Sequence, residues 1–206
     1  MKYALPVSSG FKGDVPCCTV LFRGKTLRSL RKCSVWDEVN CVRPIELRSG
    51  DIGVFTRTKK GAFGHSVIEW RVVKEIEDIS PDSFERVKPT YLDVFAPEEW
   101  GSVNEPNLCS DDTIVAIGHV AAQVSRRKVK YAAMKFKFDP KTGKRSQLCI
   151  IATRKSFPSG RAKRQGLADV VYPAGTRSID GRVMLYAGTG DAEVQQTDVS
   201  GCVDFG

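Results

Sequence analysis

Short apolar runs separated by turn residues dominate this chain of 206 residues, and this pattern constrains its fold more than any other feature. No stretch of a dozen residues shows the roughly 3.6-residue periodicity of an amphipathic helix. Short strands at regular spacing, with turn chemistry between them, are typical of a sandwich, a barrel or a propeller. The strands expected from the sequence are residues 15–23, 41–48, 51–58, 64–73, 113–121, 128–139, 147–154, 168–173, 182–187 and 193–199.

Turn residues support these boundaries. Ser49-Gly50 separates two of the runs as in a hairpin, and residues 139–143 (DPKTG) and 179–181 (IDG) form further turns. One helical turn is expected over residues 81–87, with Ser80 as its cap. Three groups of strands, residues 15–73, 104–154 and 162–199, recur on the scale of a propeller blade of about 40–50 residues, although no sequence identity between them is visible.

Composition places the chain among globular proteins. Hydrophobic residues make up 41% of it and charged residues 27%. No segment approaches the roughly 20 apolar residues that span a bilayer, and the N-terminus lacks the apolar core of a signal peptide. We therefore expect one domain over residues 1–206, a cytoplasmic location and no membrane partner.

The cysteines and histidines predict no metal site. The seven cysteines are scattered without a Cys-x-x-Cys pair, and His65 and His119 are the only histidines. A structural zinc site needs paired ligands at short spacing. Reduced thiols are the simplest interpretation, and we expect no cofactor.

Positive charge is concentrated in one part of the chain. The formal net charge is +8, yet residues 126–164 hold 14 Lys and Arg against one acid, Asp139. Residues 69–112 hold 12 acids against four bases. A basic stripe can follow a polyanion. The alternation in Lys135-Phe136-Lys137-Phe138 favours the other interpretation, a strand with one wet face.

Charged residues also gather at the ends of two expected strands. Lys163, Arg164 and Asp169 precede the apolar residues 170–172, whereas Asp191 and Glu193 follow the apolar residues 184–186. Such a cluster suggests a site at the rim of a β-scaffold. Cations there can hold a phosphate, and carboxylates can hold sugar hydroxyls or move protons. The simpler alternative is a basic loop before one strand and a glycine-rich turn after the other.

Six blocks of the sequence, in order, resemble a family of five-bladed β-propeller proteins. These are the β-1,2-mannosyltransferase/phosphorylases that metabolise mannogen and their bacterial relatives of unknown function, which are related to the β-mannoside phosphorylases. The matching blocks are residues 45–57, 98–108, 118–121, 134–143, 162–172 and 185–193. The resemblance implies an all-β fold, a β-propeller of the five-bladed type. Because family members are longer at the N-terminus, this chain would be incomplete and hold about three to four blades.

The resemblance also implies a function. It predicts mannosyl transfer or phosphorolysis of β-1,2-mannosides at a funnel on the propeller axis, without a metal. The partners would be a mannose-containing oligosaccharide and a sugar phosphate or nucleotide sugar. Trp100 would stack on a sugar face or, equally, anchor a loop, and a structural role is favoured for His119. The residues expected to bind substrate or phosphate are Arg43, Arg57, Trp100, Asn104, Glu105, His119, Lys163, Arg164 and Asp191.

One departure from the family pattern bears on catalysis. The family motif reads Lys-Asp-apolar-Arg, and here residues 40–43 read Asn-Cys-Val-Arg. Arg43 is kept, but Cys41 stands where an acid or base would be, and an inverting transfer needs a positioned carboxyl. Asp169 is then the remaining catalytic candidate. Three functions stay open: a transferase or phosphorylase, a non-catalytic carbohydrate-binding protein, and a polyanion-binding protein. Nucleic acid ranks last, since no RNA-recognition motif, zinc finger or glycine-rich basic tail occurs.

Overall fold

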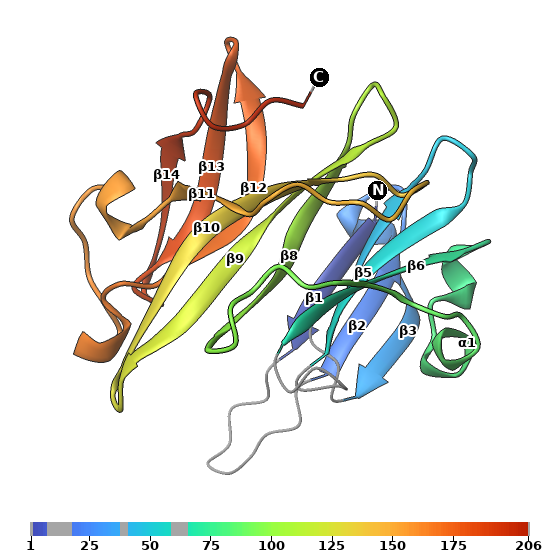
Figure 1. Ribbon diagram of the computed structural model, residues 1–206, viewed down its shortest axis with the longest axis horizontal. Helices are drawn as coiled ribbons and strands as arrows, with labels where there is room; N and C mark the ends of the chain where they lie inside the picture. The colour runs from blue at the N-terminus through green and yellow to red at the C-terminus, as the bar shows by residue number, and fades with distance from the viewer. Residues whose placement is uncertain (1, 8–17, 38–40, 59–65, 206) are drawn as a thin grey trace. The chain divides into compact units, whose positions relative to one another are not determined.

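The computed structural model describes residues 2–7, 18–37, 41–58 and 66–205, and their strands form four antiparallel sheets (Figure 1). The chain divides into two compact units. The first comprises Met1–Thr58 with Ile68–Leu92, and the second comprises Lys59–Val67 with Asp93–Gly206. No helix in the described residues is long and apolar enough to cross a membrane.

The first unit contains two of the sheets. One has the order β1 (Lys2–Val7), β2 (Cys18–Arg23), β3 (Arg31–Asp37), and the other has the order β4 (Arg43–Glu46), β5 (Ile52–Thr58), β6 (Val67–Val73), β7 (Thr90–Leu92). Short helices connect strands within each sheet: η1 (Leu27–Ser29) joins β2 to β3, and η2 (Ile76–Asp78) with α1 (Pro81–Glu85) joins β6 to β7. The two sheets, η2 and α1 share one hydrophobic core, made of Leu21, Trp36, Val42, Ile52, Val54, Val73, Ile76, Ile79 and Phe84.

Helix α1 forms where the sequence predicts it. The Ser80 hydroxyl accepts a hydrogen bond from the Ser83 backbone N–H at 3.3 Å and so caps a free donor of the first turn. Phe84 is buried and meets the ring of Trp36 edge-on, with centroids 4.7 Å apart. This contact fixes the helix to the β1–β3 sheet.

A mostly buried ion pair lies on β6. Arg71 pairs with Glu69, and both side chains are nearly nine-tenths buried. The Arg71 Nε donates to the Val87 carbonyl at 2.9 Å, and the guanidinium lies 5.0 Å from the Phe84 ring centroid. Arg71 therefore ties the segment after α1 to the sheet.

The second unit contains the other two sheets. One has the order β11 (Cys149–Ala152), β10 (Lys128–Phe138), β9 (Ile114–Ser125), β8 (Glu99–Leu108), and the other has the order β12 (Val171–Ile179), β13 (Arg182–Thr189), β14 (Glu193–Asp198). Between them lie η3 (Arg154–Ser156) and η4 (Gln165–Leu167). Val115, Ile117 and Ala133 of the first sheet share a core with Val171 and Leu185 of the second.

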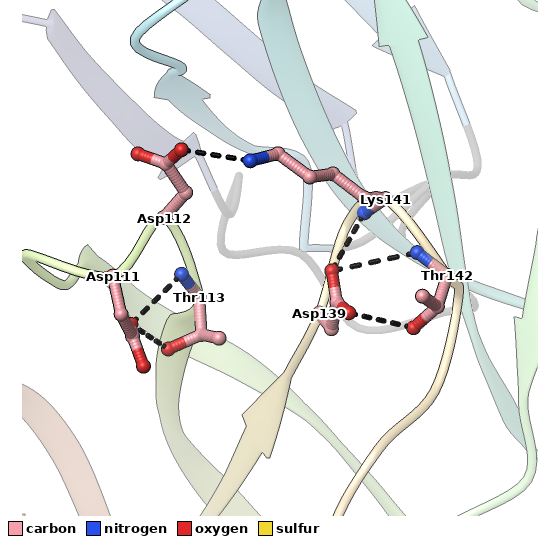
Figure 2. A network of polar contacts seen from close by, with 6 residues as sticks. All are labelled: Asp111, Asp112, Thr113, Asp139, Lys141 and Thr142. Atoms are coloured by element: carbon pink, nitrogen blue, oxygen red, sulfur yellow. Dashed lines mark hydrogen bonds and ion pairs between the residues drawn. The ribbon is translucent and has the colours of Figure 1, made fainter.

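Two turns at one end of the β8–β11 sheet are held by a polar network (Figure 2). Asp139 accepts hydrogen bonds from the Lys141 N–H at 2.8 Å and the Thr142 hydroxyl at 2.7 Å. The Lys141 ammonium reaches Asp112 at 2.9 Å in the facing turn, where Asp111 accepts from Thr113. The network joins the β8–β9 and β10–β11 turns.

The expected strands are largely present, with two differences. Lys135–Phe138 alternates between partly or fully exposed lysines and buried phenylalanines, as predicted. The first expected group, residues 15–73, is wrong as a unit, because β2 and β4–β6 belong to different sheets. Strands β1, β3, β7 and β8 were not expected. Residues 15–17 and 64–65 of the expected strands, including His65, lie outside the described part of the chain.

Candidate functional site

A β-bulge on β8 gathers polar side chains in the second unit. The pairing of β8 with β9 places Ser102 opposite His119, and its register then shifts between Val103 and Glu105. The inserted residue, Asn104, has its side-chain amide oxygen Oδ1 2.8 Å from Nδ1 of His119. An amide oxygen accepts hydrogen bonds, so this contact is a hydrogen bond in the tautomer that carries its proton on Nδ1.

His119 contacts two tyrosine rings. It is buried, with 3% of its surface exposed. The Tyr131 ring stacks on it with centroids 5.5 Å apart, and the Tyr172 ring is tilted over it at 4.7 Å. The Ser102 hydroxyl lies 3.5 Å from Nδ1. These contacts hold the imidazole ring of His119 in one orientation.

The aromatic group extends to Trp100. Its indole Nε1 donates to the Tyr131 hydroxyl at 3.3 Å, and the two rings meet edge-on with centroids 6.1 Å apart. Trp100 and Tyr131 are half-buried, whereas Tyr172 is 37% exposed. We call Trp100, Asn104, His119, Tyr131 and Tyr172 the aromatic cluster. Rings with polar atoms at their edges, partly open to solvent, suit a sugar face and its hydroxyls.

Glu105 connects the two sheets of this unit. Its Oε2 accepts hydrogen bonds from the Thr176 backbone N–H at 2.8 Å and the Thr176 hydroxyl at 2.7 Å. Glu105 was predicted to bind a sugar hydroxyl, but one of its two carboxylate oxygens is already bonded to Thr176 of β12.

Asp169 lies beside the aromatic cluster. Its backbone carbonyl accepts from the Tyr131 N–H at 3.1 Å, and its carboxylate is 2.7 Å from the Lys128 ammonium. The hydrogen bond to Lys128 is the main cause that lowers the pKa of Asp169, with further attraction from Lys130 and Arg154. Asp169 is therefore ionised at neutral pH and suits a base better than an acid.

The predicted cations of the loop before β12 lie at the surface. The Lys163 ammonium pairs with Asp191 at 3.2 Å, and both side chains are more than half exposed. The Lys163 N–H also donates to the Gly190 carbonyl at 2.9 Å. Arg164 is exposed and begins η4. Lys163 and Asp191 therefore lie together at the surface, and their roles in binding stay predictions.

The remaining predicted residues lie in the first unit. Arg43 of β4 is the cross-strand partner of Phe55, so Arg43 and Arg57 project from the same face of the sheet. The Arg57 Nε is buried, and it has no hydrogen-bond partner in the described part of the chain. Cys41 lies just before β4 with a positive φ of 71°. A buried donor without a partner is uncommon and is a natural contact for an anion.

The structure therefore brings Trp100, Asn104 and His119 into one cluster, with Asp169 beside it. Sequence reasoning missed Tyr131 and Tyr172, which complete that cluster. No local motif marks either tyrosine. The signal that could have identified Tyr131 is strand register, since Tyr131 is opposite Ala121, two positions from His119 on the same face of the sheet.

Solved structures share this fold, which confirms the all-β, propeller-like class. A mannose phosphorylase of Leishmania mexicana (MPT-4, in complex with a phosphate ion) matches with a TM-score of 0.85 and 24% identity, over 97% of this chain and 63% of that one. A GDP-Man-dependent mannosyltransferase of the same organism (MPT-1) has a TM-score of 0.83 at 24% identity, over 97% and 64%. A β-1,2-mannobiose phosphorylase of Listeria innocua has 0.65 at 15%, over 97% and 55%. The chain spans less than two thirds of each.

The family follows from the sequence itself. Residues 11–202 match the family described as "Protein of unknown function (DUF1861)", and the chain belongs to that family. No curated protein sequence matches it.

Proposed function

We propose that this protein acts on β-1,2-mannosides as a glycosyltransferase or glycoside phosphorylase, with mannose 1-phosphate or a nucleotide-activated mannose. The observation that carries the proposal is the fold match over 97% of the chain to a mannose phosphorylase that holds a phosphate ion. The chain's own residues supply the groups that such chemistry needs, in two places.

Arg43 and Arg57 are proposed to hold the phosphate. Both project from one face of the β4–β7 sheet, and the Arg57 Nε is a buried donor that a phosphate oxygen would satisfy. Guanidinium groups suit phosphate because their planar donors can form two parallel hydrogen bonds.

The aromatic cluster is proposed to hold mannose units. Tyr172 is 37% exposed, its ring contacts the buried His119, and the Asn104 side-chain oxygen lies 2.8 Å from Nδ1 of His119. Sugar rings present both C–H faces and hydroxyls, so this combination matches them.

Proton transfer is the step for which the residues fit least well. Asp169 is ionised beside Lys128 and could take a proton from an attacking hydroxyl or orient it. Cys41 lacks the carboxyl that the family resemblance leads us to expect. We therefore propose Cys41→Asp as the variant that gains turnover.

The direct test is an assay of the full chain with mannose 1-phosphate and mannose, in which released phosphate and new disaccharide are measured. We expect Tyr172→Ala to reduce product formation at least tenfold. Val194→Ala is the matched control, because Val194 lies in the β12–β14 sheet and is 79% exposed. Equal activity of both variants would contradict the proposed sugar site.

If turnover is too slow to detect, ligand binding can be measured instead through the unfolding temperature. A ligand that binds only the folded state raises the unfolding temperature, so mannose 1-phosphate should stabilise the protein. The shift should be lost in Arg57→Met, which keeps much of the aliphatic length but removes the guanidinium.

The second candidate is a non-catalytic carbohydrate-binding protein, and Cys41 favours it. In that case both the parent and Cys41→Asp would bind mannosides without turnover. Turnover in Cys41→Asp alone would instead show that the scaffold is competent and lacks only the carboxyl.

A further inference from the structure

A dense group of cations lies next to the aromatic cluster in the second unit. They come from the β9–β10 hairpin, from η3, and from the loop that leads into η4. All are exposed except Arg154, which is half-buried. We call this group the basic rim; it consists of Arg126, Arg127, Lys128, Lys130, Arg154, Lys155, Arg161, Lys163 and Arg164.

Backbone contacts hold these segments together. A Cβ atom at Gly166 of η4 would overlap the carbonyl oxygen of Arg127, so the loop lies directly against the hairpin. The Tyr131 N–H donates to the Asp169 carbonyl at 3.1 Å, and the Asp169 carboxylate pairs with Lys128. Figure 1 shows the orange loop segment beside the yellow end of β10. The cations of the hairpin and of the loop around η4 therefore form one surface, and Arg154 of η3 is near enough to Asp169 to contribute to its lowered pKa.

Carboxylates neutralise only part of this surface. Asp169 pairs with Lys128, and Asp191 pairs with Lys163. Glu193 accepts from the Arg161 backbone N–H at 3.1 Å. Within the described residues, nine cations of the basic rim thus meet three carboxylates. Clustered charge of one sign attracts ligands of the opposite sign.

The basic rim begins where the aromatic cluster ends. Lys128 and Lys130 lie three residues and one residue before Tyr131 on β10, and Tyr131 stacks on His119. A strand rises about 3.3 Å per residue, so Arg126 lies on the order of 16 Å from Tyr131 along the hairpin. A short oligosaccharide seated on the aromatic cluster can reach the rim.

We infer that the glycan bound by this unit is anionic and carries phosphate groups on mannose units beyond the one at the aromatic cluster. The inference rests on the proposed function and adds the substrate class to it. Five of the nine rim cations are arginines, whose planar donors favour phosphate oxygens. A neutral mannan gives this excess of charge no partner.

The test compares two oligosaccharides that differ in one group: mannopentaose with a 6-phosphate, and the same pentasaccharide after the phosphate is removed. Binding is measured by calorimetry at low and at physiological salt. We expect the phosphorylated form to bind about tenfold more tightly, as one or two charge-assisted hydrogen bonds would give, and its advantage to fall with salt.

The variant Arg126→Glu with Arg127→Glu should abolish this advantage and leave the affinity for the neutral pentasaccharide unchanged. Its control is Lys25→Glu with Arg28→Glu, two exposed cations of the first unit, which should keep the advantage. Arg164→Gln, a single exposed change outside the hairpin, repeats the test if the double variant folds poorly.

Three results would overturn the inference. Equal binding of the two pentasaccharides would overturn it and leave the proposed function intact. Equal binding of duplex DNA with no effect of Tyr172→Ala would show a general polyanion surface instead. Failure of both pentasaccharides to bind, with no response to Tyr172→Ala, would overturn the inference and the proposed function together.

Discussion

The two ends of the β8–β11 sheet are both rich in lysine and arginine, yet they use these residues differently. At the end with the β8–β9 and β10–β11 turns, Lys137 pairs with Asp111 and Lys141 with Asp112, each at 2.9 Å. At the other end, the basic rim has three times as many cations as carboxylates. Both ends are therefore basic, but the lysines of the turn end form ion pairs that hold the turns, whereas most cations of the basic rim have no carboxylate partner among the described residues.

The basic rim depends most on the contact between η4 and the β9–β10 hairpin, because this contact brings the cations of both segments together. In Gly166→Ala the new Cβ would overlap the Arg127 carbonyl oxygen, so the loop must move. We expect a loss of about 1–3 kcal/mol in the free energy of unfolding, as overpacking typically costs, measured by urea denaturation. Gly201→Ala is the matched control, since no atom lies within 4 Å of its added Cβ. Equal stabilities of the two variants would contradict the contact.

A smaller effect is expected from Asp169→Asn, which removes a carboxylate from the basic rim. The ion pair with Lys128 is partly exposed, so its loss should cost about 0–1 kcal/mol. The affinity for the phosphorylated pentasaccharide should rise, because Lys128 is released. An unchanged or lower affinity would count against the idea that unpaired cations bind the ligand.

The same variant has a defined pH signature. The pKa of Asp169 is lowered in the folded state, so its contribution to stability is complete above the unfolded pKa near 3.8 and is lost as pH falls through the folded value. Between neutral pH and about pH 4 the stability difference between parent and variant should stay constant. Below that range the difference should shrink.

The smallest effect on oligosaccharide binding is expected from variants at the β8–β9 and β10–β11 turns. The Thr113 hydroxyl and N–H and the Lys137 ammonium lower the pKa of Asp111, with the hydroxyl as the largest cause. In Thr113→Val the hydroxyl is lost and the pKa of Asp111 should rise toward its usual value, as measured by carboxylate NMR titration. Thr142→Val should raise the pKa of Asp139 in the same way. Oligosaccharide binding should not change in either variant.

Local chemistry predicted much of this fold. The cap at Ser80, the turn at residues 139–143 and the lysine–phenylalanine alternation on β10 each depend on neighbours in sequence. Strand β8 was missed because Gly101, Asn104 and Pro106 all lower β-propensity. Pairing with β9 and burial of its first half override that preference.

The candidate site was predicted only in part, for the same reason. Asn104 and His119 were chosen separately, but their hydrogen bond depends on a bulge that no local pattern announces. Tyr172 reaches His119 from another sheet, so its role is set by packing between elements far apart in sequence. The chemical type of a site residue was readable from the sequence, whereas its partners were not.

The backbone of Cys41 has a conformation that suits aspartate, the residue that the family resemblance leads us to expect there. Among the described residues other than glycine, positive φ occurs at Cys41 (71°), Asp112 (66°), Asp180 (49°) and Asp191 (55°). Aspartate enters this left-handed region more readily than most side chains do, because its short polar group bonds locally. Position 41 thus has a conformation that suits the missing carboxylate. Cys41→Asp should relieve backbone strain as well as supply an acid, and the free energy of unfolding should then rise even without turnover.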